Sequence, residues 1–147
     1  MKNVWLTFAV GLLSASALIS GYSKVARRAP GNEEIVRKFE AAFNKHDVAA
    51  MSSIVTEDAQ WFSIEGDKMA VETNGKAAME KWLKGYFQSC PSCHSEFEAL
   101  MVAGSYVTVH EKAMWESKSG PKSQKGLGVY EVRDGLIRRV WYYPAEK

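Results

Sequence analysis

The chain has 147 residues, of which 46% are hydrophobic and 24% charged, and its formal net charge is +2. This composition indicates one globular domain with a real core and makes a second domain of ordinary size improbable. Its 19 basic residues are scattered among 17 acidic ones, so no nucleic-acid partner is expected. Five Trp, six Tyr and six Phe are a heavy aromatic load, which indicates a large apolar interior or pocket.

Residues 1–23 predict a signal peptide. Lys2 precedes an apolar run from Val4 to about Ile19, and small residues follow as far as Ser23. The run is shorter than the roughly 20 residues that a membrane-spanning helix needs, so no stable membrane insertion is expected after cleavage. An uncleaved anchor is the alternative that the pattern leaves open. The mature protein is therefore expected to be periplasmic or secreted, with residues 24–32 as a basic linker.

Three helices are predicted from apolar residues at helical spacing. The first begins after Asn32, with two glutamates in its opening turn, and the second runs from Val48 to Val55 behind an Asp47 cap. The third follows Asn74-Gly75. The apolar stripes consist of Ile35, Val36, Phe39, Ala42 and Phe43 in the first helix, and of Met79, Trp82, Leu83, Tyr86 and Phe87 in the third.

Strands are predicted mainly in the second half of the chain. An early strand spans 59–64, with a short partner at 68–71, and alternation of Phe97, Ala99 and Met101 and of Val107 and Val109 predicts two more. Residues 117–126 are polar and are expected to form a turn. Two alternating segments within 127–143 meet at Asp134-Gly135, a strong hairpin signal. Helices packed against an antiparallel sheet predict an α+β fold.

Three segments carry a family resemblance: EEIVRKFEAAFNKHDVAAMSSIVTEDAQW, NGKAAMEKWLKGYF and VYEVRDGLIRRVWYY. In these segments the chain resembles the SnoaL-like branch of the nuclear transport factor 2 superfamily, with residues 33–147 as the domain. The resemblance implies a cone-shaped curved antiparallel sheet packed on three helices of the N-terminal half, with an interior pocket. It also implies a homodimer formed through the sheet. Members include ketosteroid isomerases, epoxide hydrolases, polyketide cyclases, dehydratases and proteins without catalytic activity, so the fold alone selects no reaction.

The resemblance also permits a check for steroid isomerase chemistry. In that pattern a tyrosine of the first helix and two aspartates of the sheet act on the substrate. By alignment those positions hold Phe39, Ser63 and Gly128 here. Steroid isomerase chemistry by the same residues is therefore not expected, and the Asp-Arg-Asp arrangement of the epoxide hydrolases has no evident counterpart.

Glu111 is the candidate catalytic residue. It shares a predicted strand face with Val107, Val109, Ala113 and Trp115, where lost hydration would raise the pKa of its carboxyl group and suit it to general acid or base catalysis. The structural alternatives are an ion pair with a base such as Arg139, or exposure at the sheet margin. His110 lies on the opposite face, and a register error of one residue would exchange the two.

Five residues at alternating strand positions are predicted to line a substrate pocket. The aromatic residues would form a wall that contacts a flat or apolar ligand, and the hydroxyl groups would orient the ligand. Packing in the core explains the aromatic residues equally well. The five are Trp61, Ser63, Trp115, Tyr130 and Trp141.

Cys90 and Cys93 are the two cysteines of the chain, and in an exported protein they predict a disulfide that closes a tight loop. The segment CPSCH also matches the attachment motif of c-type haem, and a redox-active or unpaired dithiol is a third interpretation. The three histidines are dispersed, so no metal site is predicted. No organic cofactor is required.

Taken together, the sequence predicts an exported protein that binds a small apolar or aromatic molecule. Proton transfer of an isomerase, hydrolase or dehydratase type is the candidate reaction, and whether the protein is an enzyme stays open. The alternatives are a binding or dimerisation module without catalysis, whose pocket is filled by side chains, and a haem electron carrier.

Overall fold

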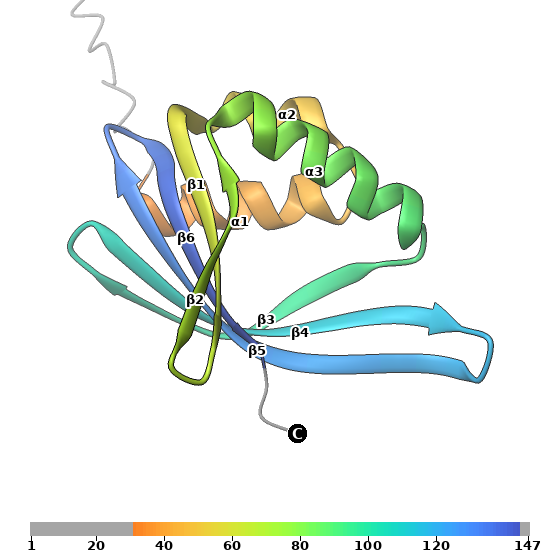
Figure 1. The fold of residues 1–147 in the computed structure, drawn as a ribbon. Helices are drawn as coiled ribbons and strands as arrows, with labels where there is room; N and C mark the ends of the chain where they lie inside the picture. The colour runs from red at the N-terminus through yellow and green to blue at the C-terminus, as the bar shows by residue number, and fades with distance from the viewer. Residues whose placement is uncertain (1–30, 145–147) are drawn as a thin grey trace, which may run out of the picture.

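The computed structural model describes residues 31–144. The predicted signal peptide and most of the predicted linker lie outside these residues. The helices are α1 (Asn32–Phe43), α2 (Val48–Ser53) and α3 (Lys76–Ser89). The strands are β1 (Val55–Glu65), β2 (Lys68–Asn74), β3 (His94–Ala103), β4 (Tyr106–Ser117), β5 (Gly120–Arg133) and β6 (Leu136–Pro144). Figure 1 shows the helices gathered on one face of a curved sheet, which confirms the predicted α+β cone fold.

The six strands form one sheet in the order β2-β1-β6-β5-β4-β3. Four of its five strand pairs are antiparallel, as predicted. The pair β1 and β6 is parallel, so the sheet is mixed. A parallel pair requires a crossover connection, and here the whole chain from β2 to β5 lies between the two strands. The pattern of each strand taken alone does not reveal this pairing.

The helices form where their apolar periodicity predicts them. Helix α1 already includes Asn32, whose side chain donates to the Gly104 carbonyl at 2.8 Å and does not cap the helix. Helix α1 buries Ile35, Val36, Phe39 and Ala42, and its first turn holds two glutamates. The Asp47 side chain accepts a hydrogen bond of 2.9 Å from the backbone N–H of Ala50 and so caps α2. Helix α2 ends at Ser53, earlier than predicted, because Val55 is buried and already begins β1.

The core lies between the helices and the inner face of the sheet. Helix α1 packs across β3 to β6, and α3 packs on β1 and β2. The most deeply buried sheet residues include Val107, Val109, Ile137 and Val140, each 0% exposed. Within residues 31–144, no helix is long and apolar enough to cross a membrane.

Two strands differ from the sequence-based expectation. A bulge between Phe97 and Ala99 shifts the register of β3, so Phe97 faces the helices whereas Met101 is 62% exposed. The predicted turn at 117–126 is mostly strand, because β5 begins at Gly120. Residues 121–125 are exposed and carry no alternation of apolar and polar residues that would signal a strand.

The predicted hairpin at Asp134-Gly135 joins β5 to β6. Both residues have left-handed backbone angles, with φ of 51° at Asp134 and 76° at Gly135. Two consecutive left-handed residues are what a tight hairpin turn requires, since this twist matches that of the strands it joins. The turn sets the register that places Tyr130 opposite Val140.

Candidate functional site

A cavity of about 390 Å³ lies between α1, α3 and the inner face of the sheet. Its volume falls within the range of about 300–1,000 Å³ that small-molecule pockets occupy. Among the described residues that line it, nine are aromatic, two are glutamates, and none is a lysine, arginine or histidine. The lining consists of Phe39, Glu40, Phe43, Trp61, Ser63, Trp82, Tyr86, Cys90, Cys93, Ser95, Phe97, Glu111, Ala113, Trp115, Gln124, Tyr130 and Tyr142.

Glu111 extends into this cavity from β4. Its cross-strand neighbours are Phe97 on β3 and Gly126 on β5. Burial raises the pKa of the Glu111 carboxyl group, and a hydrogen bond from the Ser95 side chain acts against this by lowering it. Within residues 31–144 no lysine, arginine or histidine forms an ion pair with Glu111.

The basic residues that could have paired with Glu111 form ion pairs with other carboxylates. Arg139 donates to Glu131, which is 1% exposed, at a distance of 3.1 Å, and Arg133 binds the same carboxylate at 2.8 Å. His110 lies on the other face of β4, 3.1 Å from the Glu98 carboxylate. The register of β4 therefore places Glu111, and not His110, in the cavity.

Glu40 is a second carboxyl group in the cavity, and the sequence analysis did not identify it. Burial raises the pKa of Glu40, and the nearby Glu111 carboxylate raises it further, whereas a backbone hydrogen bond from Phe97 and the charge of Arg37 lower it. The helical spacing of α1 could have identified Glu40. Glu40 lies four residues after Val36 and three before Phe43, so it shares their helix face.

Four of the five predicted pocket residues line the cavity: Trp61, Ser63, Trp115 and Tyr130. The fifth, Trp141, does not. It lies on the opposite face of the sheet, where its ring stacks on Phe62 with centroids 5.7 Å apart. Val140 and Tyr142 take the inward positions of β6 instead. Because Val140, Trp141, Tyr142 and Tyr143 are all apolar or aromatic, alternation could not identify the inward face.

The helix side of the cavity carries its own aromatic residues. Trp82 of α3 lies 5.4 Å from Trp61 and 5.7 Å from Tyr86, measured between ring centroids. Phe39 of α1 contacts both Trp61 and Tyr130, at 6.3 Å and 6.2 Å. Trp82 and Tyr86 appear in the predicted helix stripe, where their spacing indicated only that they face the core.

Three tyrosines, Tyr86, Tyr130 and Tyr142, line the cavity. The Tyr86 hydroxyl already donates to a sulfur atom of the cavity wall, whereas those of Tyr130 and Tyr142 have no such partner within residues 31–144. Burial raises the pKa of Tyr86, raises that of Tyr130 well above its ordinary value, and raises that of Tyr142 to about 12. The charge of Glu111 contributes to all three increases. The hydroxyl groups therefore stay protonated at neutral pH and can donate hydrogen bonds to a ligand.

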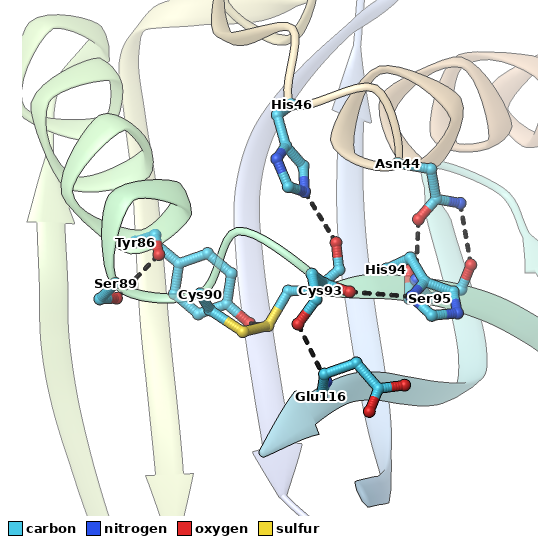
Figure 2. The surroundings of a disulfide bond; sticks show 10 residues. Asn44, His46, Tyr86, Ser89, Cys90, Cys93, His94, Ser95 and Glu116 are labelled. Atoms are coloured by element: carbon cyan, nitrogen blue, oxygen red, sulfur yellow. Dashed lines mark hydrogen bonds between the residues drawn. A yellow bond between two sulfur atoms is a disulfide. The ribbon is translucent and has the colours of Figure 1, made fainter. Parts of the chain in front are cut away.

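The strand that carries Ser95 is fixed by a side chain from the turn after α1. The Asn44 amide nitrogen donates to the Ser95 carbonyl at 2.8 Å, and its amide oxygen accepts from the Ser95 N–H at 2.7 Å. Figure 2 shows both bonds. Ser95 is 5% exposed. This pairing holds in place the serine that bonds to Glu111.

The predicted disulfide between Cys90 and Cys93 is present and forms part of the cavity wall. Figure 2 shows the His46 ring directed toward the Cys93 carbonyl oxygen. His46 Nε2 lies 2.8 Å from that oxygen, and the His46 ring also stacks on Phe87. The Tyr86 hydroxyl donates to Cys93 Sγ at 3.5 Å. Because the two sulfurs bond to each other, neither is free to attach a haem vinyl group.

The positions that would carry steroid isomerase chemistry hold no acid. Phe39 and Ser63 line the cavity, and a Cβ atom at Gly128 would lie 3.0 Å from a Val109 methyl carbon and 3.2 Å from the Tyr130 ring. An aspartate at Gly128 would therefore require its neighbours to move. No cluster of three or more metal-ligating side chains occurs in the part of the chain that the structure describes.

Comparison with protein families finds the SnoaL-like domain, which matches residues 36–140. The chain belongs to this family. The predicted resemblance is thereby confirmed, and the match covers α1 to most of β6. Comparison with curated protein sequences finds no match.

Solved structures with the same fold support this assignment. An uncharacterised cystatin-fold protein from Novosphingobium aromaticivorans is 24% identical, covers 77% of this chain and 97% of its own, and has a TM-score of 0.68. TerC, co-crystallised with polyporic acid, is 18% identical, with coverages of 78% and 91% and a TM-score of 0.66. An NTF2-like protein from Cytophaga hutchinsonii is 13% identical, with coverages of 81% and 94% and a TM-score of 0.63. At these identities the likeness concerns the fold.

Proposed function

We propose that this SnoaL-like protein binds a small organic molecule with a flat apolar or aromatic body in its cavity and transfers a proton to or from it. Glu111 is the acid or base, and Trp61, Trp115 and Tyr130 hold the molecule, with Ser63 orienting it. The observation that carries the proposal is an unpaired, desolvated carboxyl group in the wall of an aromatic cavity. TerC, which shares the fold, has been co-crystallised with the organic molecule polyporic acid.

The competing interpretation is a module without catalysis whose pocket is filled by side chains. It requires a packed interior and a Glu111 that is neutralised by a base. The cavity of about 390 Å³ and the engagement of Arg139 by Glu131 both favour the binding function instead. Trp61 packs on Trp82, and both Trp61 and Trp115 line the cavity.

A simple proton abstraction tests the proposal without knowledge of the natural substrate. In 5-nitrobenzisoxazole, a flat aromatic molecule, a base removes the ring C–H proton, the N–O bond breaks, and a coloured cyanophenolate forms. The protein should accelerate this reaction, and Glu111→Gln should reduce the rate by about 100-fold or more. Glu116→Gln, the same change at an exposed position of β4, is the matched control. Equal rates in all three proteins would remove Glu111 from the proposed role.

We also propose that the protein is exported and dimeric. Export is supported by the N-terminal pattern and by a disulfide, since disulfides persist in oxidising compartments. Fractionation of cells that express the full chain, with and without residues 1–23, tests it.

Dimerisation is supported by exposed Tyr106, Leu127 and Tyr143 on the sheet. Light scattering on Leu127→Glu should give the monomer mass, and a wild-type monomer would refute the proposal.

A further inference from the structure

The charge balance of the cavity points to a more specific class of ligand. Among residues 31–144 its wall contains two glutamates and nine aromatic rings but no lysine, arginine or histidine. Such a wall offers carboxyl groups and the rings of Trp, Tyr and Phe to whatever enters. We infer that the ligand is an organic cation, a quaternary or protonated amine with a flat apolar body. This inference rests on the proposed binding function and narrows its ligand class.

The aromatic residues of the cavity are of the kind that bind cations. Cations are attracted to aromatic faces within about 6 Å of the ring centroid, most strongly to Trp. Trp61 and Trp82 lie 5.4 Å apart, so a headgroup beside one of them is close to the other. Trp115 belongs to the sheet wall of the same cavity. Three tryptophans and three tyrosines therefore surround a space large enough for a trimethylammonium group and an attached ring.

Within residues 31–144 neither carboxyl group forms an ion pair. The charges that act on the pKa of Glu40 are those of Glu111 and Glu96, which are negative, and of Arg37, which already pairs with Glu33 at 2.9 Å on the exposed side of α1. Around Glu111 the other titratable groups are Glu40 and the tyrosines Tyr86, Tyr130 and Tyr142. A bound cation would supply the positive charge that the protein does not provide.

One nearly buried side chain of the cavity has a hydroxyl group that a ligand can reach. Tyr130 is 3% exposed and lines the cavity, and its hydroxyl group forms no hydrogen bond to another side chain or to the backbone within residues 31–144. Among these residues the fully buried side-chain polar atoms without a partner are those of Thr56 and Thr73, so the Tyr130 hydroxyl is open to the cavity, where water or a ligand can satisfy it. Its position beside the two glutamates suits a polar substituent on the body of the cation.

Two probes that differ only in charge test the inference. In 3-hydroxyphenyltrimethylammonium the quaternary nitrogen stands where 3-tert-butylphenol has a carbon atom, so size and shape are matched. Isothermal titration calorimetry of the wild-type protein should give an affinity for the cationic probe that is about tenfold or more above the affinity for the neutral probe. Equal affinities would overturn the inference and leave the proposed function intact. Binding of neither probe would overturn both.

Variants and pH provide the second arm of the test. Glu40→Gln and Glu111→Gln should each weaken cation binding by about tenfold and leave the neutral probe unaffected, with Glu116→Gln as the control. Because the cation binds the ionised carboxylates, its affinity in the wild type should rise between about pH 5 and about pH 8, whereas that of the neutral probe should not rise. A cation affinity that is independent of pH and of both substitutions would overturn the inference even if the cation binds.

Discussion

Glu40 of α1 and Glu111 of β4 line the same cavity from its helix side and its sheet side, and the charge of Glu111 raises the pKa of Glu40. Burial is the larger cause for Glu40 and the only cause that raises the pKa of Glu111. Because an ionised Glu111 disfavours ionisation of Glu40, the structure favours a Glu40 that keeps its proton after Glu111 has lost its own.

The raised pKa of Glu111 predicts how stability depends on pH. A carboxyl group whose pKa is higher in the folded than in the unfolded protein binds more protons when folded, so stability falls as pH rises above the ordinary value of 4.5. Glu111→Gln removes this penalty. We expect the free energy of unfolding of the variant, relative to that of the wild type, to increase from about pH 4 to about pH 8. Urea unfolding at both values measures it, and a constant difference would contradict the prediction.

The Cys90–Cys93 disulfide should contribute modestly to stability. It closes a loop of only four residues, for which the chain-entropy estimate is about 2 kcal/mol. Reduction with dithiothreitol should lower the free energy of unfolding by about that amount and leave the domain folded. The double variant Cys90→Ser/Cys93→Ser should not respond to reductant. A loss of all structure on reduction would show that the bond holds more than the local turn.

Arg139 should matter more for stability than its sequence neighbour Arg138. Arg139 binds the nearly inaccessible carboxylate of Glu131, whereas Arg138 binds Asp58, which is 61% exposed. Arg139→Met leaves a buried charge with Arg133 as its remaining partner and should cost about 1–3 kcal/mol. Arg138→Met should cost less, because water replaces the lost partner. Chemical denaturation of the two variants compares them, and the opposite ranking would refute the argument.

The sequence was sufficient for the helices, the closing hairpin and the family, because each depends on local periodicity or on a short turn signal. It placed Trp61, Ser63, Glu111, Trp115 and Tyr130 on the face that forms the cavity. It misplaced Trp141, since four successive apolar or aromatic residues of β6 give no alternation. The bulge in β3 reversed the inward and outward sense of the residues after Phe97, and no pattern in the sequence marks that extra residue.

Glu40 shows a different limit of sequence analysis. A glutamate beside an apolar helix stripe is common, and most such residues reach water at the edge of the stripe. The role of Glu40 in the cavity depends on Glu111, which lies 71 positions later in the chain. The two residues come to the same cavity only because α1 packs across β4. Contacts between residues far apart in the sequence, like the pairing of β1 with β6, depend on the topology of the fold. Local sequence patterns do not show them.

The place of β6 in the sheet has a consequence for how the protein is made. Strand β6 lies between β1 and β5 and is the only link between the pair β1–β2 and the trio β3–β5 within the described sheet. The sheet, and with it the core beneath α1 and α3, is incomplete until β6 has left the ribosome. The two halves of the sheet should therefore join only once β6 is available, and not one strand after another as the chain emerges.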